Sequence, residues 1–267
     1  MNAHSEPLSL VKNTRVAVVI PAYNEARLIA KTLNGIPHWV TDIVMVDDAS
    51  TDLTVQVAQQ VYAEWDITRS TDFYIVQHDD NMGVGQAILS GYEYAYQSGC
   101  DIAVVVGADA QMDPMEMHSL VDALLAGADY VKGDRMRHPD ARQLIPKMRY
   151  LGNRILSILT GYIAGLSSLS DAQCGYTALR LKMLDKLPLD KIYPRYGFPN
   201  DFLIRLAEVG ARITQIPVTP IYASEQSKLS IPKVIAPISW LLMKAYLRMI
   251  FRGRQRVEWR DLSSYHP

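Results

Sequence analysis

Short apolar runs along the chain alternate with segments whose apolar residues recur at the spacing of a helix. The runs cover residues 15–20, 42–46, 73–77 and 102–106, with a further short one at 130–132. They are brief and rich in β-branched residues, which is typical of strands buried on both faces. Helices are expected between them, at 26–36, from the capping residues 50–52 to Val61, at 86–97 and at 114–125.

This alternation predicts an α/β fold with a doubly wound, mostly parallel sheet and flanking helices. In such sheets ligands bind beyond the carboxyl ends of the strands. Polar clusters stand at four of these ends, at residues 23–25, 47–48, 79–81 and 109–111. A dense group of carboxylates needs a metal ion or another cation to be stable. We therefore expect a cation-dependent site along one rim of the sheet.

The glycines at 83 and 85 raise the alternative of a dinucleotide site. The loop Asn81-Met82-Gly83-Val84-Gly85 lacks the third glycine of that fingerprint and follows the third strand, not the first. The sequence also contains no P-loop, nucleophile elbow, HExxH motif or Cys/His cluster. The sequence therefore lacks the common signatures of dehydrogenases, P-loop NTPases, α/β-hydrolases and zinc proteins.

The composition is that of an ordinary globular protein, with 49% hydrophobic and 21% charged residues in 267. It excludes a disordered, collagen-like or coiled-coil chain, and we expect no nucleic-acid partner. Two cysteines, Cys100 and Cys174, indicate a reducing compartment, with one long-range disulfide as the alternative. Residues 1–15 contain no apolar stretch of signal-peptide length, so we expect a cytoplasmic location.

Charge is distributed unevenly along the chain. From Lys228 onward the net charge is +6, which leaves −7 on the rest. A basic tail on an acidic body indicates an anionic surface or partner. Residues 155–170 and 229–251 are apolar, but glycines and serines interrupt the first and three basic residues the second, so neither is expected to span a bilayer. The second segment either lies in a membrane interface or packs on the core as a helix.

Four motifs carry a resemblance to a known family: VVIPAYNE at 18–25, VDDASTDLT at 46–54, NMGVGQA at 81–87 and ADAQMDP at 108–114. Together they resemble the inverting glycosyltransferases of family 2, and most of all the polyprenyl- and dolichyl-phosphate sugar transferases. Later segments, at 133–135, 170–180, 196–218 and 225–229, extend the similarity. The resemblance implies a GT-A fold over residues 15–230, with an extension at 1–14 and a basic amphipathic helical segment at 231–267.

The resemblance also implies roles for single residues on the donor side. The expected donor-binding residues are Pro21, Ala22, Tyr23, Glu25, Asp48, Gly83, Asp109 and Lys228. Asp109 and Gln111 fall on the family's metal motif, where they would hold Mg²⁺ or Mn²⁺ together with the donor diphosphate. A purely structural role stays open as the alternative for three of these residues. Pro21 and Ala22 would then form a turn at the end of a strand, and Asp109 would cap the following helix without binding a metal.

On the acceptor side the resemblance implies roles for Arg135, Asp171 and Gln173. Arg135, like Lys228, matches residues that contact the diphosphate or an acceptor phosphate, where a cation stabilises charge on the leaving group. Asp201 stands where relatives with hydroxyl acceptors carry a general base. With a lipid phosphate no strong base is needed, and Asp201 becomes an orienting residue or a helix cap. The expected catalytic set is Asp109, Asp201 and Arg135.

One position departs from the family pattern. The motif usually reads Asp-x-Asp, and Gly107 stands at its first position. We expect a working enzyme with an altered metal shell; a changed donor and a degenerate nucleotide-sugar-binding protein are the alternatives.

The resemblance thus implies an inverting transferase that moves a sugar from a GDP- or UDP-linked donor to an acceptor. A polyprenyl phosphate at a membrane surface is the expected acceptor, and a soluble hydroxyl compound is the alternative. The chain would then be free in the cytoplasm or attached peripherally to the cytoplasmic face of a membrane, with a second copy or a membrane protein as a further partner.

Overall fold

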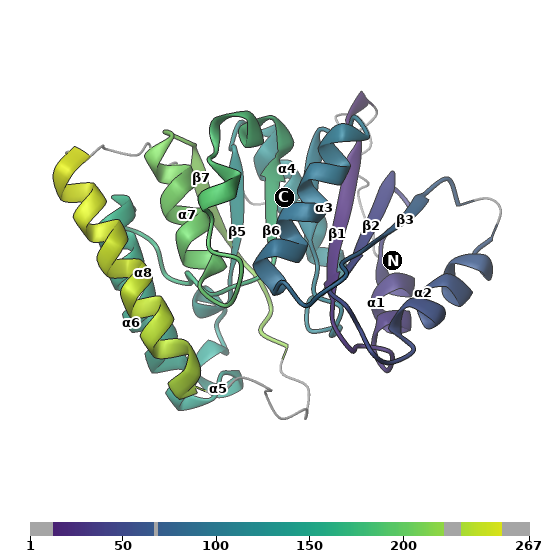
Figure 1. Cartoon of the computed structure of the whole chain (residues 1–267), viewed down its shortest axis with the longest axis horizontal. Helices are drawn as coiled ribbons and strands as arrows, with labels where there is room; N and C mark the ends of the chain where they lie inside the picture. Colours follow the sequence, from purple (N-terminus) through teal and green to yellow (C-terminus); the bar gives the residue numbers. More distant parts are fainter. Residues whose placement is uncertain (1–12, 67–68, 222–230, 253–267) are drawn as a thin grey trace.

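The computed structural model describes residues 13–66, 69–221 and 231–252, which form a seven-stranded sheet between two layers of helices (Figure 1). The strands are β1 (Val16–Ala22), β2 (Asp42–Asp47), β3 (Asp72–Gln77), β4 (Ile102–Val105), β5 (Tyr130–Asp134), β6 (Thr177–Arg180) and β7 (Ile213–Pro217). The α-helices are α1 (Ile29–Gly35), α2 (Thr54–Ala63), α3 (Val84–Gln97), α4 (Met117–Leu125), α5 (Ala141–Leu144), α6 (Lys147–Ala164), α7 (Phe198–Glu208) and α8 (Ile231–Arg252). Short 3-10 helices η2 (Pro114–Glu116), η3 (Arg135–Arg137), η4 (Leu181–Lys186) and η5 (Leu189–Lys191) connect them.

The strands and helices expected in the first half of the chain are confirmed as β1 to β5 and α1 to α4, and so is the doubly wound sheet. One boundary differs, because β1 continues through Pro21 to Ala22. Val106 N, just after β4, donates to Val19 O, and Asp48 N, just after β2, donates to Ala22 O. Backbone polar groups point to alternate sides along a strand, so those of residue 21 point toward β4, as those of Val19 do. Pairing with β4 has already ended at Val19, and a proline without an N–H is tolerated there.

The first helix also begins later than its apolar pattern suggests. Asn24 adopts a left-handed conformation, with φ of 55°, and its side chain accepts hydrogen bonds from Thr51 N at 2.8 Å and Asp52 N at 3.3 Å. These bonds tie the loop after β1 to the loop after β2. Helix α1 therefore starts only at Ile29, and α2 at Thr54.

Strand β6 runs antiparallel to both of its neighbours, in the order β3-β2-β1-β4-β6-β5-β7. Its first residue, Thr177, pairs with Val105 at the carboxyl end of β4. The segment that leads into β6, residues 171–176, is therefore delivered to the rim where ligands bind in parallel sheets. The sequence pattern predicts neither β6 nor β7, which are four and five residues long.

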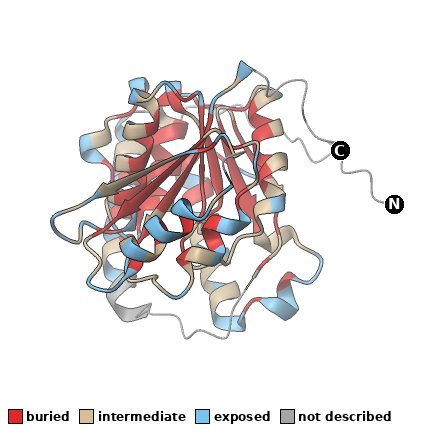
Figure 2. Cartoon of the chain, turned by 90° about the vertical axis from the view of Figure 1, so that its right-hand side faces the viewer, coloured by how far each residue is buried: buried red, intermediate tan, exposed pale blue. Residues whose placement is uncertain are grey.

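Apart from the edge strand β3, the strands of the sheet are largely buried (Figure 2). Helices α1, α2 and α4 cover one face, and α3 and α7 cover the other. On this second side, α6 and α8 lie next to each other at the end of the molecule beyond α7 (Figure 1). The two helices are thus well separated from α1 and α2, which lie at the opposite end.

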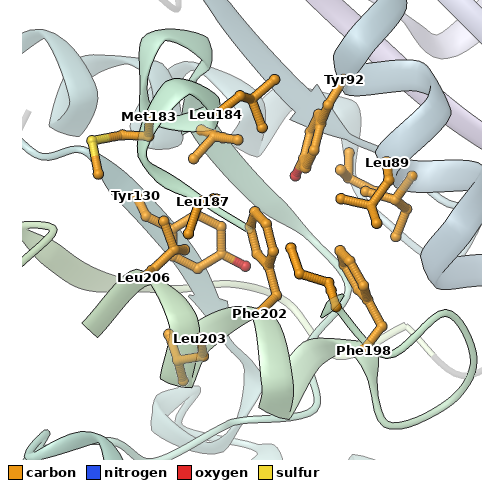
Figure 3. Packing of buried hydrophobic residues seen from close by; sticks show 14 of the residues in the cluster. Leu89, Tyr92, Tyr130, Met183, Leu184, Leu187, Phe198, Phe202, Leu203 and Leu206 are labelled. Carbon is orange, nitrogen blue, oxygen red and sulfur yellow. The ribbon is translucent and has the colours of Figure 1, made fainter. Parts of the chain in front are cut away.

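Aromatic rings fasten α7 to the rest of the core (Figure 3). Phe202 is fully buried, and its ring centroid lies 5.0 Å from that of Phe198, 5.7 Å from that of Tyr130 and 5.9 Å from that of Tyr92. These rings come from α7, β5 and α3. Aromatic pairs at such separations each contribute about 0.5–1.5 kcal/mol beyond the area they bury. The start of α7, and the loop before it, are therefore fixed against α3.

The two cysteines are buried free thiols, so the disulfide alternative is wrong. Helix α8 packs on the core, which confirms one of the two expectations for the C-terminal segment; the membrane interface stays a prediction. Ile238, Leu241 and Ala245 pack into the core, whereas Trp240 and Phe251 are exposed. Within the described part of the chain, no helix has the length and apolar character needed to cross a membrane.

We predict that Gly91→Ala destabilises the fold. A Cβ at Gly91 in α3 would lie 2.3 Å from Val19 Cγ1 and 3.2 Å from Val46 Cγ2, so the helix has to move off β1 and β2. The expected loss in the free energy of unfolding is about 1–3 kcal/mol, measured by urea denaturation. Gly152→Ala in α6 is the matched control. A Cβ at Gly152 meets nothing within 4 Å, so the exchange should leave stability unchanged or raise it by up to about 1 kcal/mol.

Candidate functional site

The loops that follow β1, β2 and β4 share an unusual backbone feature. Each contains a non-glycine residue with positive φ: Asn24 at 55°, Ala49 at 62° and Ala110 at 52°. Such residues cost free energy and cluster where the surrounding structure holds a functional geometry. All three lie at the carboxyl rim of the sheet, as the polar clusters in the sequence predicted.

A pocket of about 390 Å³ opens at this rim. Its lining residues are Pro21, Ala22, Tyr23, Glu25, Asp48, Asn81, Gly83, Val84, Ala87, Gly107, Ala108, Asp109, Arg195 and Tyr196. Seven of the eight expected donor-binding residues line it. The eighth, Lys228, lies outside the described residues. We call this cavity the donor pocket.

The carboxylate of Asp48 holds the glycine loop that forms one wall of the donor pocket. Met82 N donates to Asp48 Oδ1 and Gly83 N donates to Asp48 Oδ2, both at 2.8 Å. His78 Nδ1 lies 2.8 Å from Oδ1, and its Nε2 lies 2.9 Å from Ser90 Oγ in α3. Asp48 is buried, so these bonds offset the cost of removing its charge from water. In this geometry Asp48 shapes the pocket wall; a direct contact with the base or ribose stays a prediction.

Glycine is required in that loop by both its conformation and its neighbours. Gly83 has a φ of 97°, and a Cβ there would lie 2.7 Å from Arg195 Cγ and 2.8 Å from Pro194 O. At Gly85 a Cβ would meet the Phe198 ring. Gln86 N donates to Pro194 O at 3.0 Å. The segment before α7 is therefore seated directly on the glycine loop.

This seating brings Arg195 and Tyr196 into the donor pocket, where sequence reasoning did not place them. Arg195 Nη2 donates to Asn81 O at 3.1 Å. Residues 81 and 195 are 114 positions apart, and no motif spacing relates them. The only sequence signal is that Tyr196 opens the last long motif of the family resemblance.

A second, smaller pocket of about 130 Å³ adjoins the first. It is lined by Asp109, Gln111, Met112, Arg135, Cys174, Gly175, Tyr176, Val218, Thr219 and Ile221. Asp109 lines both cavities, so the two adjoin at this residue. Arg135, which was expected on the acceptor side, lies here, and we call this cavity the acceptor pocket.

The two residues expected to bind the metal, Asp109 and Gln111, both line the acceptor pocket and can offer a carboxylate and an amide oxygen. Those donors fit Mg²⁺ or Mn²⁺, which bind few protein oxygens and take their other ligands from phosphate and water. Asp109 Oδ1 accepts a hydrogen bond from Gln111 N at 3.2 Å. In the described ranges no three Asp, Glu, His or Cys residues gather into a larger metal cluster. A Cβ at Gly107 would lie 2.9 Å from Asp109 Oδ1, so this carboxylate occupies space next to the missing side chain.

Arg135 is oriented by a buried partner. Its Nε donates to Asp171 Oδ2 at 2.8 Å and its Nη2 to Asp171 Oδ1 at 3.1 Å. Burial alone would raise the pKa of Asp171, but the Arg135 guanidinium outweighs it and holds that pKa below its ordinary value. Asp171 is fully buried and lines neither pocket, so it acts on the acceptor pocket through Arg135.

Gln173 and Asp201 line neither pocket. Gln173 Nε2 donates to Asn200 Oδ1 at 2.5 Å, and Asn200 Nδ2 donates to Thr160 Oγ1 at 2.7 Å, which links the acceptor side to α7 and α6. Asp201 lies in the first turn of α7, where its carboxylate accepts from Tyr193 N at 2.9 Å. Its other oxygen is 3.6 Å from Arg248 Nη2. Asp201 thus fixes the loop at Tyr193 to the start of α7; its expected roles as an orienting residue or a general base stay predictions.

Lys132 is a buried charge that the sequence pattern showed only as part of a strand. Its side chain is inaccessible to solvent, and Nζ donates to Cys174 O at 2.6 Å. Burial lowers the pKa of Lys132 from 10.5 to about 8. Cys174 lines the acceptor pocket, so Lys132 supports that wall from the core side.

The comparisons with known proteins agree with this geometry. A family model described as Glycosyl transferase family 2 matches residues 17–187. The chain is 28% identical over 216 residues to a UDP-N-acetylglucosamine–dolichyl-phosphate N-acetylglucosaminyltransferase of Methanococcus voltae, which covers 78% of this chain and 86% of the relative. It is 31% identical over 217 residues to an undecaprenyl-phosphate mannosyltransferase of Micrococcus luteus, which covers 77% of this chain and 83% of that one.

Among solved structures, the chain resembles glucosyl-3-phosphoglycerate synthase from Mycobacterium tuberculosis in complex with Mn²⁺, uridine diphosphate and glucosyl-3-phosphoglycerate. The TM-score is 0.66 at 19% identity, with 95% of this chain and 83% of that chain covered. At this identity the likeness is one of fold, and it confirms the GT-A fold.

We predict a pH-dependent stability term from Lys132. Between pH 8 and 10.5 the unfolded chain holds a proton on this lysine that the folded chain has lost, so stability rises with pH across this window. The gain should be on the order of 1–3 kcal/mol. Urea unfolding of the native chain and of Lys132→Met at pH 7 and pH 9.5 measures this gain. The comparison with the variant is needed because buried thiols such as Cys100, whose pKa is raised by burial, add their own pH dependence to the free energy of unfolding. Lys182→Met, at an exposed position, is the control, and an identical pH profile for native chain and Lys132→Met would contradict the prediction.

Proposed function

The chain belongs to glycosyl transferase family 2, and we propose that it transfers a sugar from a UDP- or GDP-linked donor to a polyprenyl phosphate, with inversion at the anomeric carbon. One observation carries the proposal: two adjoining pockets of different size share Asp109. A nucleotide sugar fits the larger and an acceptor phosphate the smaller, so their reacting atoms would meet at this carboxylate. Residues 15–230 would form the transferase domain and 231–267 a C-terminal attachment segment.

On the donor side, the glycine loop and the end of β1 would enclose the nucleotide. Tyr23, about half exposed, offers a ring at the mouth of the pocket, and Glu25 an acceptor for hydroxyl groups. Asp109 and Gln111 would hold Mg²⁺ or Mn²⁺, which when bound neutralises the charge that develops on the leaving diphosphate. The absence of a carboxylate at Gly107 leaves this shell with fewer protein ligands.

The chemistry is a single displacement. A phosphate oxygen of the acceptor forms a bond to the anomeric carbon while the bond from that carbon to the diphosphate oxygen breaks, and the electron pair leaves with the nucleoside diphosphate. Attack from the opposite side inverts the configuration. The acceptor oxygen is already an anion, so no general base is required, which accords with Asp201 lining neither pocket. Arg135, held by Asp171, would orient the attacking phosphate.

The names of the two relatives support a lipid acceptor, because they specify dolichyl phosphate and undecaprenyl phosphate. Helices α6 and α8 support it independently. Each exposes a stripe of large apolar side chains at helical spacing, and Tyr162 and Tyr246 stack across the boundary between them. The exposed residues are Met148, Leu151, Ile155, Ile158, Leu159 and Tyr162 on α6, and Trp240, Met243, Tyr246, Leu247, Ile250 and Phe251 on α8.

We call this surface the α6–α8 face. Large contiguous apolar patches on a protein surface mark interaction sites. Basic residues accompany it: Lys147 and Arg154 are exposed on α6, and Lys244 lies 5.1 Å from the centre of the Trp240 ring. Apolar side chains mixed with basic ones match the boundary of an anionic bilayer. We therefore assign the α6–α8 face to the membrane that carries the lipid acceptor.

We predict that Asp109→Asn loses metal-dependent donor binding and most of the transfer. The native chain should show a rise in Tm with UDP or GDP that increases with Mn²⁺, and the variant should lose the Mn²⁺-dependent part. Transfer of labelled sugar to undecaprenyl phosphate should fall by roughly two orders of magnitude. Asp113→Asn is the control, since Asp113 caps η2 and lines neither pocket. Binding without any turnover in the native chain would favour a nucleotide-sugar-binding protein instead.

We predict that the native chain sediments with phosphatidylglycerol-containing vesicles at low salt and is released at high salt. The double variant Ile158→Glu/Phe251→Glu should bind at least tenfold more weakly, because each side chain loses apolar burial and gains repulsion. Leu53→Glu, at a residue as exposed as Ile158 but just before α2, should leave vesicle binding unchanged. A native chain that stays in the supernatant at low salt would overturn the membrane assignment.

A further inference from the structure

The described lining of the donor pocket is poor in positive charge for a cavity that is proposed to take a diphosphate. Its described lining contains three carboxylates, those of Glu25, Asp48 and Asp109. Among the described residues that line it, Arg195 is the only lysine or arginine. A diphosphate carries about two negative charges, and anions of this kind are bound by cations and N–H donors. The balance of charge in the pocket therefore rests on Arg195 more than on any other described side chain.

The backbone that carries Arg195 is held in place from three sides. Pro194 O accepts from Gln86 N, and Arg195 O accepts from Phe198 N at 2.8 Å. The Arg195 Cγ lies against the position where Gly83 lacks a Cβ. Phe198 is anchored in the aromatic cluster of the core. The base of the side chain is thus fixed at the pocket wall, which lowers the entropy lost when its tip binds a ligand.

The tip of the side chain remains exposed. Nη2 donates to Asn81 O at 3.1 Å, and Nη1 lies at the limit of hydrogen bonding, 3.5 Å from Asn81 Oδ1. A guanidinium has five N–H donors in a planar fork suited to two oxygens of a phosphate. The contacts with Asn81 therefore leave most of this donor capacity for a ligand in the pocket.

We propose that Arg195 binds the diphosphate of the nucleotide-sugar donor and shares the neutralisation of the leaving group with the metal ion. The inference rests on the proposed function and deepens it by naming the side chain on the donor phosphates. It also gives a reason why the site tolerates glycine at position 107. The metal ion has one carboxylate ligand fewer there, and the guanidinium of Arg195 supplies positive charge that does not depend on metal binding. The competing role is purely structural, a tie between the loop at Asn81 and the loop before α7.

The test is calorimetric binding of UDP, UMP and uridine, and of GDP, GMP and guanosine, in EDTA without metal. In the native chain one series should bind, with affinity rising from nucleoside to diphosphate. Arg195→Gln should weaken the diphosphate by about tenfold or more and leave the nucleoside within about twofold, since only the phosphates lose a charge-assisted bond. Arg195→Lys should give an intermediate loss. Arg142→Gln, at an exposed position in α5 outside both pockets, should change nothing.

Three outcomes contradict the inference, and they are distinguishable. If Arg195→Gln weakens nucleoside and diphosphate equally, Arg195 is a structural tie, and the proposed function stands. If all affinities remain unchanged, Arg195 does not contact the ligand. If no nucleotide binds the native chain, with or without Mn²⁺, the proposed function itself fails and the inference fails with it.

Discussion

The buried carboxylate of Asp48 is the interaction on which the donor pocket depends. Both of its oxygens accept a backbone N–H from the glycine loop, and His78 connects it to α3 through Ser90. A loop with a glycine at φ of 97° has little intrinsic preference for one shape, so an external anchor must select it. Once the loop is fixed, the segment before α7 has a surface to sit on. The pocket wall is therefore built outward from a single side chain at the end of β2.

Charge is arranged differently on the two sides of Asp109. The donor pocket is lined by carboxylates, which suits a site where a divalent ion is to be shared with a ligand. The acceptor pocket has Arg135, whose charge is balanced by the buried Asp171. Removing one partner of such a pair leaves the other buried without compensation, so the pair behaves as one unit. Its function is to fix the direction of the guanidinium more than to add charge.

The sequence was sufficient for the elements whose pattern is local. Strands β1 to β4 contain short apolar runs, and the polar clusters in the loops after the strands lie at one rim, where seven of the eight residues expected to bind the donor line one pocket. Strands β6 (TALR) and β7 (ITQIP) are no shorter than β4 and β5, but polar residues interrupt them, so neither stands out as an apolar run. Arg195 could not be found from spacing, because its position depends on how Phe198 packs in the core. Lys132 was equally hidden, since lysine is rarely buried and nothing in a five-residue strand marks which way its side chain points.

The division of the lining residues between the two pockets has a consequence for how such an enzyme can change. Among the residues that the structure describes, those lining the donor pocket come from positions up to 109, except Arg195 and Tyr196, and those lining the acceptor pocket come from 109 onward. A chimera joined near residue 110 would thus exchange donor specificity almost independently of acceptor specificity. Arg195 and Tyr196 come from the second half of the chain, but their segment packs on the glycine loop of the first half. The two halves of a chimera must therefore be compatible at this contact. Recombination between relatives should succeed where residues 83, 85 and 194–198 come from compatible parents, and fail by steric conflict where they do not.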